Sequence, residues 1–421
     1  MVGRFDPLDT SRRLVTWLLR HGTGPPPRFR AWTGVEWGPG NASSTVVLRH
    51  SGALRSLLVP PTDLAAGEAY VYDDIDIEGD IVEVLRFAAG LERIPRWRAL
   101  SPMGLAMTLP REERRRRPRR ATAGGRLHSI GRDRASVRFH YDTGNDFFET
   151  FLGPTMVYSC AYFLGPEDDL ETAQTRKLDM VCRKLELRPD QHLLDVGCGW
   201  GSLVMHAATH YGVRATGVTL SAQQAQYARK RVSESGLAHR VTILECDYRE
   251  IEGTFDAIAS IGMVEHVGRS MLPTYFGTLR RLLAPGGIVL NHGIVDRHGT
   301  PPRQRRTSFV GTYVFPDGDL IPVGHSISVA EDAGFELRDV EALRMSYAHT
   351  LRRWVSNIEE HAAAARAAGS EELYRIWRLY MAGSAVAFER AAIGVDQLLL
   401  TDPARSWTFG RRAIIDARTS A

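Results

Sequence analysis

The sequence predicts an α/β fold whose core is a Rossmann-like, doubly wound sheet with helices on both faces. The first observation is the stretch from Leu193 to Leu203, LLDVGCGWGSL, which combines a buried strand, a glycine turn and the first turn of a helix. The second is the alternation of strand-like and helix-like segments from about residue 138 onward, which is typical of such sheets. The expected strands are 192–196, 213–219, 241–244, 255–261 and 287–291, with a helix over 275–283 before the last of them.

The glycine turn indicates a nucleoside site. Gly197, Gly199 and Gly201 lack a Cβ, so backbone can approach a ligand closely, and a turn at the carboxyl edge of a parallel sheet is where such folds bind nucleosides. An NAD site would have the spacing G-x-G-x-x-G and an acidic residue roughly 20 positions later. This chain has G-x-G-x-G, and the next strand ends in SAQQ without an acid. The pattern therefore favours S-adenosylmethionine (SAM), with Thr219 and Gln224 on the ribose hydroxyls.

The composition indicates a soluble, globular chain. It has 421 residues, 24% of them charged, and a formal net charge of +4, which leaves room for two or three domains. No stretch approaches the roughly 18 unbroken apolar residues of a membrane span, and the N-terminus lacks a signal-peptide pattern. The four cysteines show no spacing typical of a disulfide framework or a zinc site. These features predict a cytoplasmic protein without a metal centre.

The basic residues are unevenly chosen. Of the 53 lysines and arginines, lysine occupies only positions 177, 184 and 230. Such a bias is typical of a GC-rich genome and by itself indicates little about function.

Residues 1–110 are predicted to form a separate small α/β domain. Strands are expected at 44–48 and 54–59, and the alternation of apolar and acidic residues over 67–80 indicates an edge strand. Asp80 can cap a following helix that has one apolar face.

Residues 111–137 are predicted to be a linker to a catalytic domain over 138–421. The run EERRRRPRR, followed by ATAGG, cannot bury a core and contains breakers. A solvated tether is the simplest interpretation. A membrane-surface anchor is the second, since arginines near anionic headgroups contribute roughly 1 kcal/mol each. Nucleic-acid binding is the third, but no recognised motif or interleaved aromatic residue favours it.

Two regions outside the sheet are expected to cover the site. Residues 140–148 and 158–163 contain closely spaced aromatic side chains, which are typical of a core or a lid and can also form an electron-rich wall for a cation. The segment 343–400 is expected to be mostly helical and part of a substrate cover. Its apolar face would carry Leu351, Trp354, Ile358 and His361.

Polar side chains follow two of the predicted strands. Glu265 and His266 come after the strand 255–261, and His292 comes after the strand 287–291. Because the carboxyl ends of parallel strands meet at one edge of a sheet, we expect these side chains to lie together above the glycine turn. Each alone could be a loop residue with a satisfied hydrogen bond. They lack metal-ligand spacing such as H-x-x-x-H.

Several short motifs carry a family resemblance. They are YSCAYF (158–163), LLDVGCGWG (193–201), TLSAQQ (219–224), MVEHVG (263–268) and Phe315-Pro316. Together they resemble the cyclopropane-fatty-acyl-phospholipid synthase family, which includes the mycolic acid cyclopropane synthases. The resemblance covers about 138–400 and implies a class I SAM-dependent methyltransferase fold. The GEAY and EGD motifs within 67–80 resemble the N-terminal domain of the longer, phospholipid-acting members.

The resemblance also implies site residues. It places the ligands of a catalytic bicarbonate at Cys160, Glu265, His292, Ile294 (through its backbone) and Tyr347. It places SAM contacts at Tyr158, Ser159, Gly197, Gly199, Thr219, Gln224, Asp247 and Tyr248, to which the strand end and the turn add Asp195 and Gly201. Position 264 is valine where many relatives have phenylalanine, which alters the expected pocket wall.

The implied reaction is transfer of a methyl group from SAM to the cis double bond of a phospholipid acyl chain. Loss of a proton from the new methyl group to bicarbonate would close a cyclopropane ring. A hydride shift before proton loss would instead give a methylene branch, which a separate reductase could saturate. The expected partners are a phospholipid bilayer, at whose inner face the enzyme is peripheral, and a second copy in a homodimer, but no nucleic acid.

Two other readings stay open. A small-molecule N- or O-methyltransferase would not need the Cys160, Glu265, His292 and Tyr347 set. A non-enzymatic lipid-binding module could be built on the first domain, although the intact glycine turn argues against it.

Overall fold

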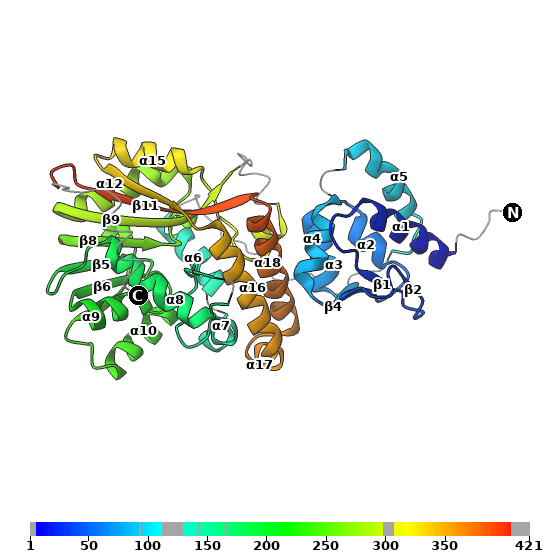
Figure 1. The fold of residues 1–421 in the computed structure, drawn as a ribbon, viewed down its shortest axis with the longest axis horizontal. Helices are drawn as coiled ribbons and strands as arrows, with labels where there is room; N and C mark the ends of the chain where they lie inside the picture. The colour runs from blue at the N-terminus through cyan, green and yellow to red at the C-terminus, as the bar shows by residue number, and fades with distance from the viewer. Residues whose placement is uncertain are drawn as a thin grey trace. The chain divides into compact units, whose positions relative to one another are not determined.

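The computed structural model describes residues 6–91, 94–111, 129–141, 143–165, 167–297 and 307–405, and the chain divides into two compact units (Figure 1). The first unit is formed by Met1–Ala121, Arg306–Val314 and Ser370–Val386, and the second by Thr122–Arg305, Phe315–Gly369 and Ala387–Ala421. The predicted catalytic domain therefore includes two segments, 306–314 and 370–386, that the structure assigns to the first unit.

The first unit contains a small sheet in the order β2-β1-β3-β4. β1 pairs parallel with β3, and the outer pairs are antiparallel. Its strands are β1 (Arg28–Arg30), β2 (Glu36–Trp37), β3 (Ser44–Leu48) and β4 (Ile75–Gly79). Its helices are α1 (Pro7–His21), α2 (Ala53–Leu58), α3 (Asp63–Val71), α4 (Ile81–Ala89), α5 (Arg96–Ala106), α14 (Phe309–Tyr313) and most of α18 (Glu371–Glu389).

The predicted strand 44–48 and the helix capped by Asp80 are confirmed, whereas two strand predictions are wrong. Residues 54–58 belong to helix α2, because a short apolar run fits a buried helix as well as a strand. The first part of 67–80 belongs to α3, which starts where the Thr62 hydroxyl accepts a hydrogen bond from Ala65 N. Only its second part forms an edge strand, β4.

The later segments join the first unit through buried arginines. Arg378 Nη1 donates to the Tyr70 hydroxyl at 2.8 Å, and Arg375 Nη1 donates to the Tyr70 carbonyl at 2.8 Å. A Cβ on Gly67 would overlap the ring of Phe309, so α3 needs glycine where α14 packs on it. These contacts join segments far apart in the sequence, which sequence periodicity does not reveal.

The second unit is built on a seven-stranded sheet, counted over the described residues, in the order β10-β11-β9-β8-β5-β6-β7. β5 to β9 pair parallel with one another, while β11 pairs antiparallel with both β9 and β10. The strands are β5 (His192–Val196), β6 (Arg214–Thr219), β7 (Val241–Glu245), β8 (Phe255–Ile261), β9 (Leu283–Asp296), β10 (Glu336–Ala342) and β11 (Ile393–Thr401). All five predicted strands are present, and the doubly wound α/β class is confirmed.

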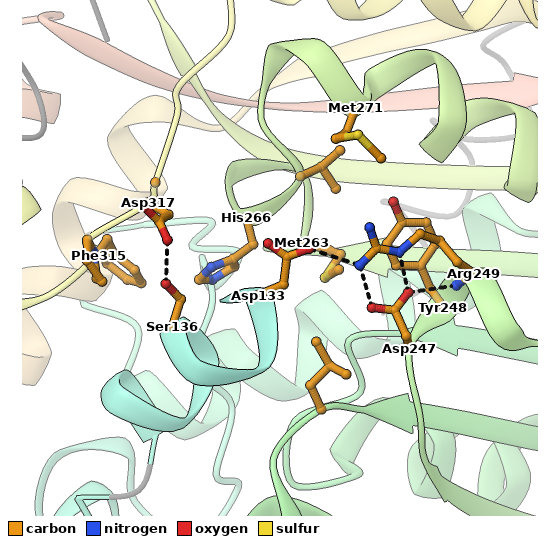
Figure 2. A pocket seen from close by; sticks show the side chains of 14 residues that line it. Asp133, Ser136, Asp247, Tyr248, Arg249, Met263, His266, Met271, Phe315 and Asp317 are labelled. Atoms are coloured by element: carbon orange, nitrogen blue, oxygen red, sulfur yellow. Dashed lines mark hydrogen bonds and ion pairs between the residues drawn. The ribbon is translucent and has the colours of Figure 1, made fainter. Parts of the chain in front are cut away.

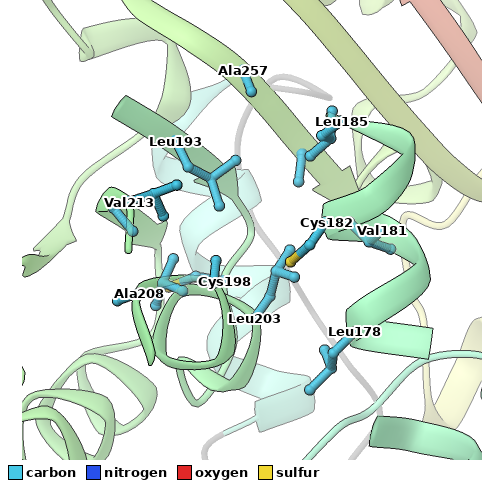
Figure 3. Packing of buried hydrophobic residues seen from close by; sticks show 14 of the residues in the cluster. Leu178, Val181, Cys182, Leu185, Leu193, Cys198, Leu203, Ala208, Val213 and Ala257 are labelled. Atoms are coloured by element: carbon cyan, nitrogen blue, oxygen red, sulfur yellow. The ribbon is translucent and has the colours of Figure 1, made fainter. Parts of the chain in front are cut away.

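Helices cover both faces of this sheet (Figure 1). Leu193 and Ala257 contribute to one apolar cluster with residues of α8, α9 and α10, and Figure 3 shows them together with side chains of α8 and α9. The next residues along each strand, Leu194 and Ile258, contribute to the other cluster, with α12 and α15. This alternation is what the pleat of a strand buried on both faces requires. The helices are α8 (Leu170–Lys184), α9 (Ser202–Tyr211), α10 (Ala222–Glu234), α12 (Leu272–Leu282) and α15 (Val323–Asp332).

The predicted linker is partly helix. Residues 130–137 belong to α6 (Ile130–Tyr141), whereas 112–128 lie outside the described residues, so no interpretation of the arginine run is tested. Helix α6 was not predicted because it has no apolar stripe. Its polar residues form ion pairs, described below. Within the described ranges, no helix has the length and apolar character to cross a membrane.

The predicted helical segment 343–400 contains α16 (Arg344–Glu360), α17 (Ala362–Ala368) and α18, but it ends in strand β11. Leu351, Trp354 and Ile358 are buried as expected. His361 is exposed at the C-terminal cap of α16, so it does not share their face. The strand was missed because β11 pairs with β9 about a hundred residues earlier, a contact that local pattern cannot show.

Candidate active site

The glycine turn after β5 has the backbone that glycine permits. Gly197, Gly199 and Gly201 have φ angles of 85°, 54° and 84°, which side-chain-bearing residues rarely adopt. The N–H groups of Gly197 and Cys198 both donate to Val218 O at 2.9 Å, so they fasten the turn to the end of β6.

A cleft of about 960 Å³ opens above this turn. A Cβ placed on Gly199 would meet none of the described atoms within 4 Å, so the turn leaves this space open for a ligand. Eight of the ten predicted SAM-binding residues line the cleft. They are Tyr158, Ser159, Asp195, Gly197, Gly199, Thr219, Gln224 and Tyr248.

The two remaining predicted residues have other contacts. A Cβ on Gly201 would come within 3.1 Å of the Ala228 Cβ, so this glycine permits close approach of α9 and α10. The Asp247 carboxylate caps a short 3-10 helix, Tyr248–Glu250, and pairs with Arg249 at 2.6 Å. Asp247 lines a neighbouring pocket instead of the cleft.

The predicted ribose ligands form a pair at the end of β6. Thr219 Oγ1 donates to Gln224 Oε1 at 2.8 Å, and Thr219 Oγ1 accepts from Ser221 N at 3.2 Å. The first bond fixes the amide of Gln224, whose nitrogen end is then the donor that can meet a hydroxyl group.

A lysine that sequence reasoning did not select lies at the wall of the cleft. Lys177, on α8, is buried and donates to Ser159 Oγ at 3.0 Å. Burial lowers the pKa of Lys177 and raises the pKa of Asp195, and their mutual attraction opposes both shifts. The cleft therefore holds a buried cation and a buried acid, the types of group that can meet the carboxylate and the ammonium of an amino acid.

Ion pairs hold helix α6 beside the cleft (Figure 2). Arg249 Nη2 contacts Asp133 Oδ2 at 2.9 Å, and Arg132 Nε contacts Asp317 Oδ2 at 2.9 Å. Ser136 Oγ also donates to Asp317, at 2.8 Å. All of these side chains except Arg132 line a pocket of about 540 Å³, which shares Leu220, Tyr248, Met263 and His266 with the cleft.

Glu265 and Ile294 meet at the carboxyl edge of the sheet. Glu265 Oε1 accepts a hydrogen bond from Ile294 N at 2.7 Å, so the backbone amide expected to hold an anion already has an acceptor. Glu265 Oε2 is buried and has no hydrogen-bond partner among the described residues. Burial raises the pKa of Glu265 to about 7, against the opposing effect of the Ile294 amide.

His292, two residues before Ile294 on β9, is also buried. Its Nδ1 lies 3.0 Å from Gln397 Nε2, while its Nε2 has no partner in the described part of the chain. Burial lowers the pKa of His292 to about 3, and the positive charges of Lys177 and Lys184 add to this effect. The imidazole is therefore neutral.

Cys160 and Tyr347 are linked through the backbone carbonyl of Leu343. The buried Cys160 Sγ is 3.8 Å from Leu343 O, the carbonyl that accepts from Tyr347 N at 3.1 Å. Burial raises the pKa of Cys160, so this thiol stays protonated. None of Cys160, Glu265, His292 and Tyr347 lines the cleft itself, and all four are buried. Two of them adjoin residues of its wall: Glu265 directly precedes His266, and His292 O accepts from Gly262 N at 2.8 Å.

An aromatic cluster surrounds Tyr158. Its ring centroid lies 5.2 Å from Trp354, 5.7 Å from Phe148 and 5.7 Å from His140. Phe148 is fully buried on α7 (Asn145–Leu152), so the predicted aromatic segments form core and wall at once. In the described ranges, no group of three or more His, Cys, Asp or Glu residues is arranged to hold a metal ion.

Comparison with known proteins decides the family. The family description "Mycolic acid cyclopropane synthetase" matches residues 128–398. A probable fatty acid methyltransferase of Pseudomonas putida is 37% identical over 382 residues, which cover 90% of this chain and 92% of that protein.

The chain belongs to the mycolic acid cyclopropane synthetase family.

Other members of the cyclopropane synthetase family agree with this assignment. A probable fatty acid methyltransferase of Mycobacterium tuberculosis is 39% identical over 397 residues, 89% of this chain and 91% of that protein. The solved structure of the mycolic acid cyclopropane synthase CmaA1, in complex with SAH and CTAB, superposes with a TM-score of 0.60 at 34% identity, covering 64% of this chain and 98% of that one. By family, the protein is a SAM-dependent transferase that methylates or cyclopropanates fatty acids, and the predicted class I methyltransferase fold is confirmed.

Three functional candidates were missed from the sequence: Lys177, Lys184 and Gln397. A signal for the two lysines was present. The chain uses arginine at 50 of its 53 basic positions, and two of its three lysines are buried, each 2% exposed. A compact ammonium fits a closed polar pocket where a planar guanidinium does not, so exceptions to the arginine bias mark such pockets. No comparable signal pointed to Gln397.

The glycine turn gives a direct test of the cleft. Gly199→Ala should weaken SAM binding at least about tenfold, because the new methyl group enters the cleft. The left-handed backbone costs a side-chain-bearing residue about 1–2 kcal/mol, which should appear separately as a lower melting temperature. Titration calorimetry with SAM measures this. Gly212→Ala is the matched control, since Gly212 also has positive φ (66°) but ends α9 away from the cleft. Gly212→Ala should lower the melting temperature because of the same backbone strain, while its Kd for SAM stays unchanged. Equal affinities for all three proteins would contradict the assignment of the cleft.

Proposed function

We propose that this enzyme adds a one-carbon unit from SAM across the cis double bond of an unsaturated phospholipid acyl chain, giving a cyclopropane ring. The methyl carbon would leave the sulfonium sulfur, whose S–C electron pair stays with S-adenosylhomocysteine, and would bond to one alkene carbon, which leaves a positive charge on the other. One proton then leaves the new methyl group, and its C–H electron pair closes the ring. The proposal is supported above all by two buried polar atoms without partners among the described residues, Glu265 Oε2 and His292 Nε2, beside a cleft suited to SAM.

The side chains present fit a small anion that has both a donor and acceptors. His292 is neutral, so one of its ring nitrogens can donate, and Glu265 can accept in its ionised form. Bicarbonate carries one O–H group and two further oxygens, so it matches this pair. Bound SAM would supply the electrophilic methyl carbon and bound bicarbonate the base. We therefore propose that Cys160, Glu265, His292, Ile294 and Tyr347 surround bicarbonate.

The chain's own residues would do the remaining work. Tyr158, Tyr347 and Trp354 present aromatic faces close to one another, which can stabilise a positive charge on the acyl chain. Tyr347 and Trp354 are buried, and this excludes water, which would otherwise capture that charge. An N- or O-methyltransferase transfers to an atom with a lone pair and needs neither feature.

The phospholipid part of the proposal is supported by the surface of the first unit. At α5, Leu100 and Met107 are 59% and 49% exposed, and Arg98 and Arg111 are exposed near them. Apolar side chains flanked by arginines suit the headgroup region of an anionic bilayer. We propose that the enzyme acts as a peripheral protein at the inner face of the membrane.

Product analysis tests the function. Purified enzyme, SAM and vesicles of a monounsaturated anionic phospholipid should yield acyl chains that are heavier by one CH2 unit, with cyclopropane proton signals by NMR. Turnover should fall when bicarbonate is removed and return when it is added back. The same mass with vinylidene proton signals would assign the methylene product instead. Unmodified lipid would reject the proposal, and turnover that does not respond to bicarbonate would reject the base.

A further inference from the structure

The side-chain amide of Gln397 connects His292 to a buried lysine. In the antiparallel pairing of β9 with β11, Gln397 lies directly opposite His292. Gln397 Nε2 is 3.0 Å from His292 Nδ1, and Gln397 Oε1 accepts from Lys184 Nζ at 2.6 Å. Lys184 also donates to Glu341 Oε2 at 2.6 Å. All four side chains are largely or fully buried, with Lys184 at 2% and Gln397 at 1% exposure.

The chemistry of these groups fixes the direction of each hydrogen bond. An ammonium group has donors only, so the end of the Gln397 amide that faces Lys184 must be the oxygen. The other end, the NH2 group, can only donate, so Nδ1 of His292 must offer a lone pair. A neutral imidazole carries one proton, which must then be on Nε2. This assignment of the tautomer follows from the donor-only ammonium group of Lys184 and needs no hydrogen position.

We propose that Gln397, oriented by Lys184, is a positioning residue that keeps the proton of neutral His292 on Nε2, the nitrogen left without a partner among the described residues. From there, His292 can donate a hydrogen bond to an anion in the active site. The identity of that anion as bicarbonate rests on the proposed function, whereas the tautomer is a property of the resting protein.

Burial and nearby positive charges keep the imidazole of His292 neutral, so that the ring carries a single proton. The charged groups that act on His292 are Lys177 and Lys184, both on α8, and both oppose a second proton on the ring. Lysine suits position 184 because its single ammonium nitrogen reaches both Glu341 and Gln397, whereas the planar fork of an arginine needs more space.

Nitrogen-15 NMR of the full-length protein labelled at histidine reads the tautomer without any ligand. His292 is assigned by the signals lost in His292→Gln. The expected result is an unprotonated Nδ1 and a protonated Nε2 from about pH 6 to 8, the range in which ordinary histidines titrate. In Gln397→Glu the carboxylate accepts from the ring, so Nδ1 becomes protonated. In Gln397→Met both tautomers are populated. Thr401 lies on the same strand as Gln397, and its hydroxyl accepts a hydrogen bond from Arg338. Thr401→Val removes this acceptor and should leave the His292 signals unchanged.

Turnover gives the second readout. Gln397→Met should lower kcat about 10- to 100-fold, the range found when the group that orients a metal-binding histidine is removed, with no change in KM for SAM. In Gln397→Glu the ring is protonated on Nδ1 as well as on Nε2. As the pH rises, it loses the proton on Nε2, which is the one that it donates to the anion. Relative to the wild type, the activity of this variant should therefore fall with rising pH. A purely structural role would lower activity equally at every pH.

The outcomes separate the two proposals. A wild-type His292 protonated on Nδ1, or a Gln397→Met protein with wild-type signals and wild-type kcat, would overturn the role of Gln397. The expected tautomer together with turnover indifferent to bicarbonate would reject the proposed base and leave the role of Gln397 intact. If Gln397→Met does not fold, the wild-type and Gln397→Glu spectra still decide.

Discussion

Glu265→Gln should lower turnover on unsaturated phospholipid by at least about 100-fold while SAM still binds. The variant keeps the oxygen that accepts from Ile294 N, so the backbone stays in place. It replaces Oε2, a buried oxygen without a partner among the described residues, by an amide that cannot carry negative charge next to a developing cation. Losing one such preorganised electrostatic contact typically lowers rates by about 10²–10³. Single-turnover product analysis measures the chemistry, and calorimetry measures SAM binding.

The same substitution should make the folded protein more stable above neutral pH. Burial raises the pKa of Glu265 from 4.5 to about 7, so between these values the folded state binds a proton that the unfolded state does not. The free energy of unfolding therefore falls as pH rises through this window and stays lower above it. Glutamine does not ionise, so Glu265→Gln should gain about 1–3 kcal/mol above pH 7 and nothing below about pH 4.5. Thermal melts across this pH range check the sign.

Asp256→Asn is the matched control for both measurements. Asp256 lies near the amino end of the same strand, β8, whereas Glu265 follows its carboxyl end. The Asp256 carboxylate accepts from His192 N at 2.7 Å. This variant should retain turnover and show no gain in stability at high pH. A Glu265→Gln enzyme with full activity would favour an N- or O-methyltransferase instead.

Trp354→Ala should destabilise the second unit by about 3–5 kcal/mol, the usual range for removing a large buried aromatic side chain. Trp354 is fully buried on α16 and packs against Tyr158, Phe151 and Tyr347, at centroid distances of 5.2, 6.1 and 6.1 Å. Because Tyr158 lines the cleft, SAM affinity should fall as well. Since two units need not unfold together, the relevant transition is the one that S-adenosylhomocysteine shifts upward.

Trp354→Phe tests whether the ring or the indole nitrogen matters. Nε1 of Trp354 has no hydrogen-bond partner in the described ranges, so phenylalanine removes an unsatisfied donor together with some volume. A net loss of about 1 kcal/mol or less is expected, since an unpaired buried donor itself costs about 1–3 kcal/mol. Trp377→Ala, in the first unit, should lower stability without reducing SAM affinity. A Trp354→Ala protein as stable as the wild type would contradict the packing argument.

The parts of the fold that depend on local pattern could be predicted from the sequence. The strands 192–196 and 255–261 have the predicted bounds, because each is a short apolar run flanked by turn residues. The order of the parallel strands then brings Glu265 and His292 to one edge, as expected from topology. The last parallel strand is longer than predicted, since β9 runs from Leu283 to Asp296 through an APGG segment that ordinarily ends a strand.

The parts that depend on distant partners could not be predicted. β9 continues past His292 because β11 pairs with it as far as Asp296, and no local feature of residues 393–401 announces that partner. The same holds for Gln397, whose role depends on a register between segments about a hundred residues apart. Residues 130–137 of helix α6 were assigned to a linker because the ion-pair partners of this helix, Arg249 and Asp317, come from elsewhere in the chain. The roles expected for individual ligands of SAM and bicarbonate stay predictions.

The division of the chain into units limits how the protein can be dissected. The chain changes unit after residues 121, 305, 314, 369 and 386, so a truncation at residue 121 would remove the first unit only in part. Arg375 and Arg378 would each lose a buried hydrogen bond to Tyr70. The fragment 122–421 would therefore carry the whole second unit together with two segments of the first, 306–314 and 370–386.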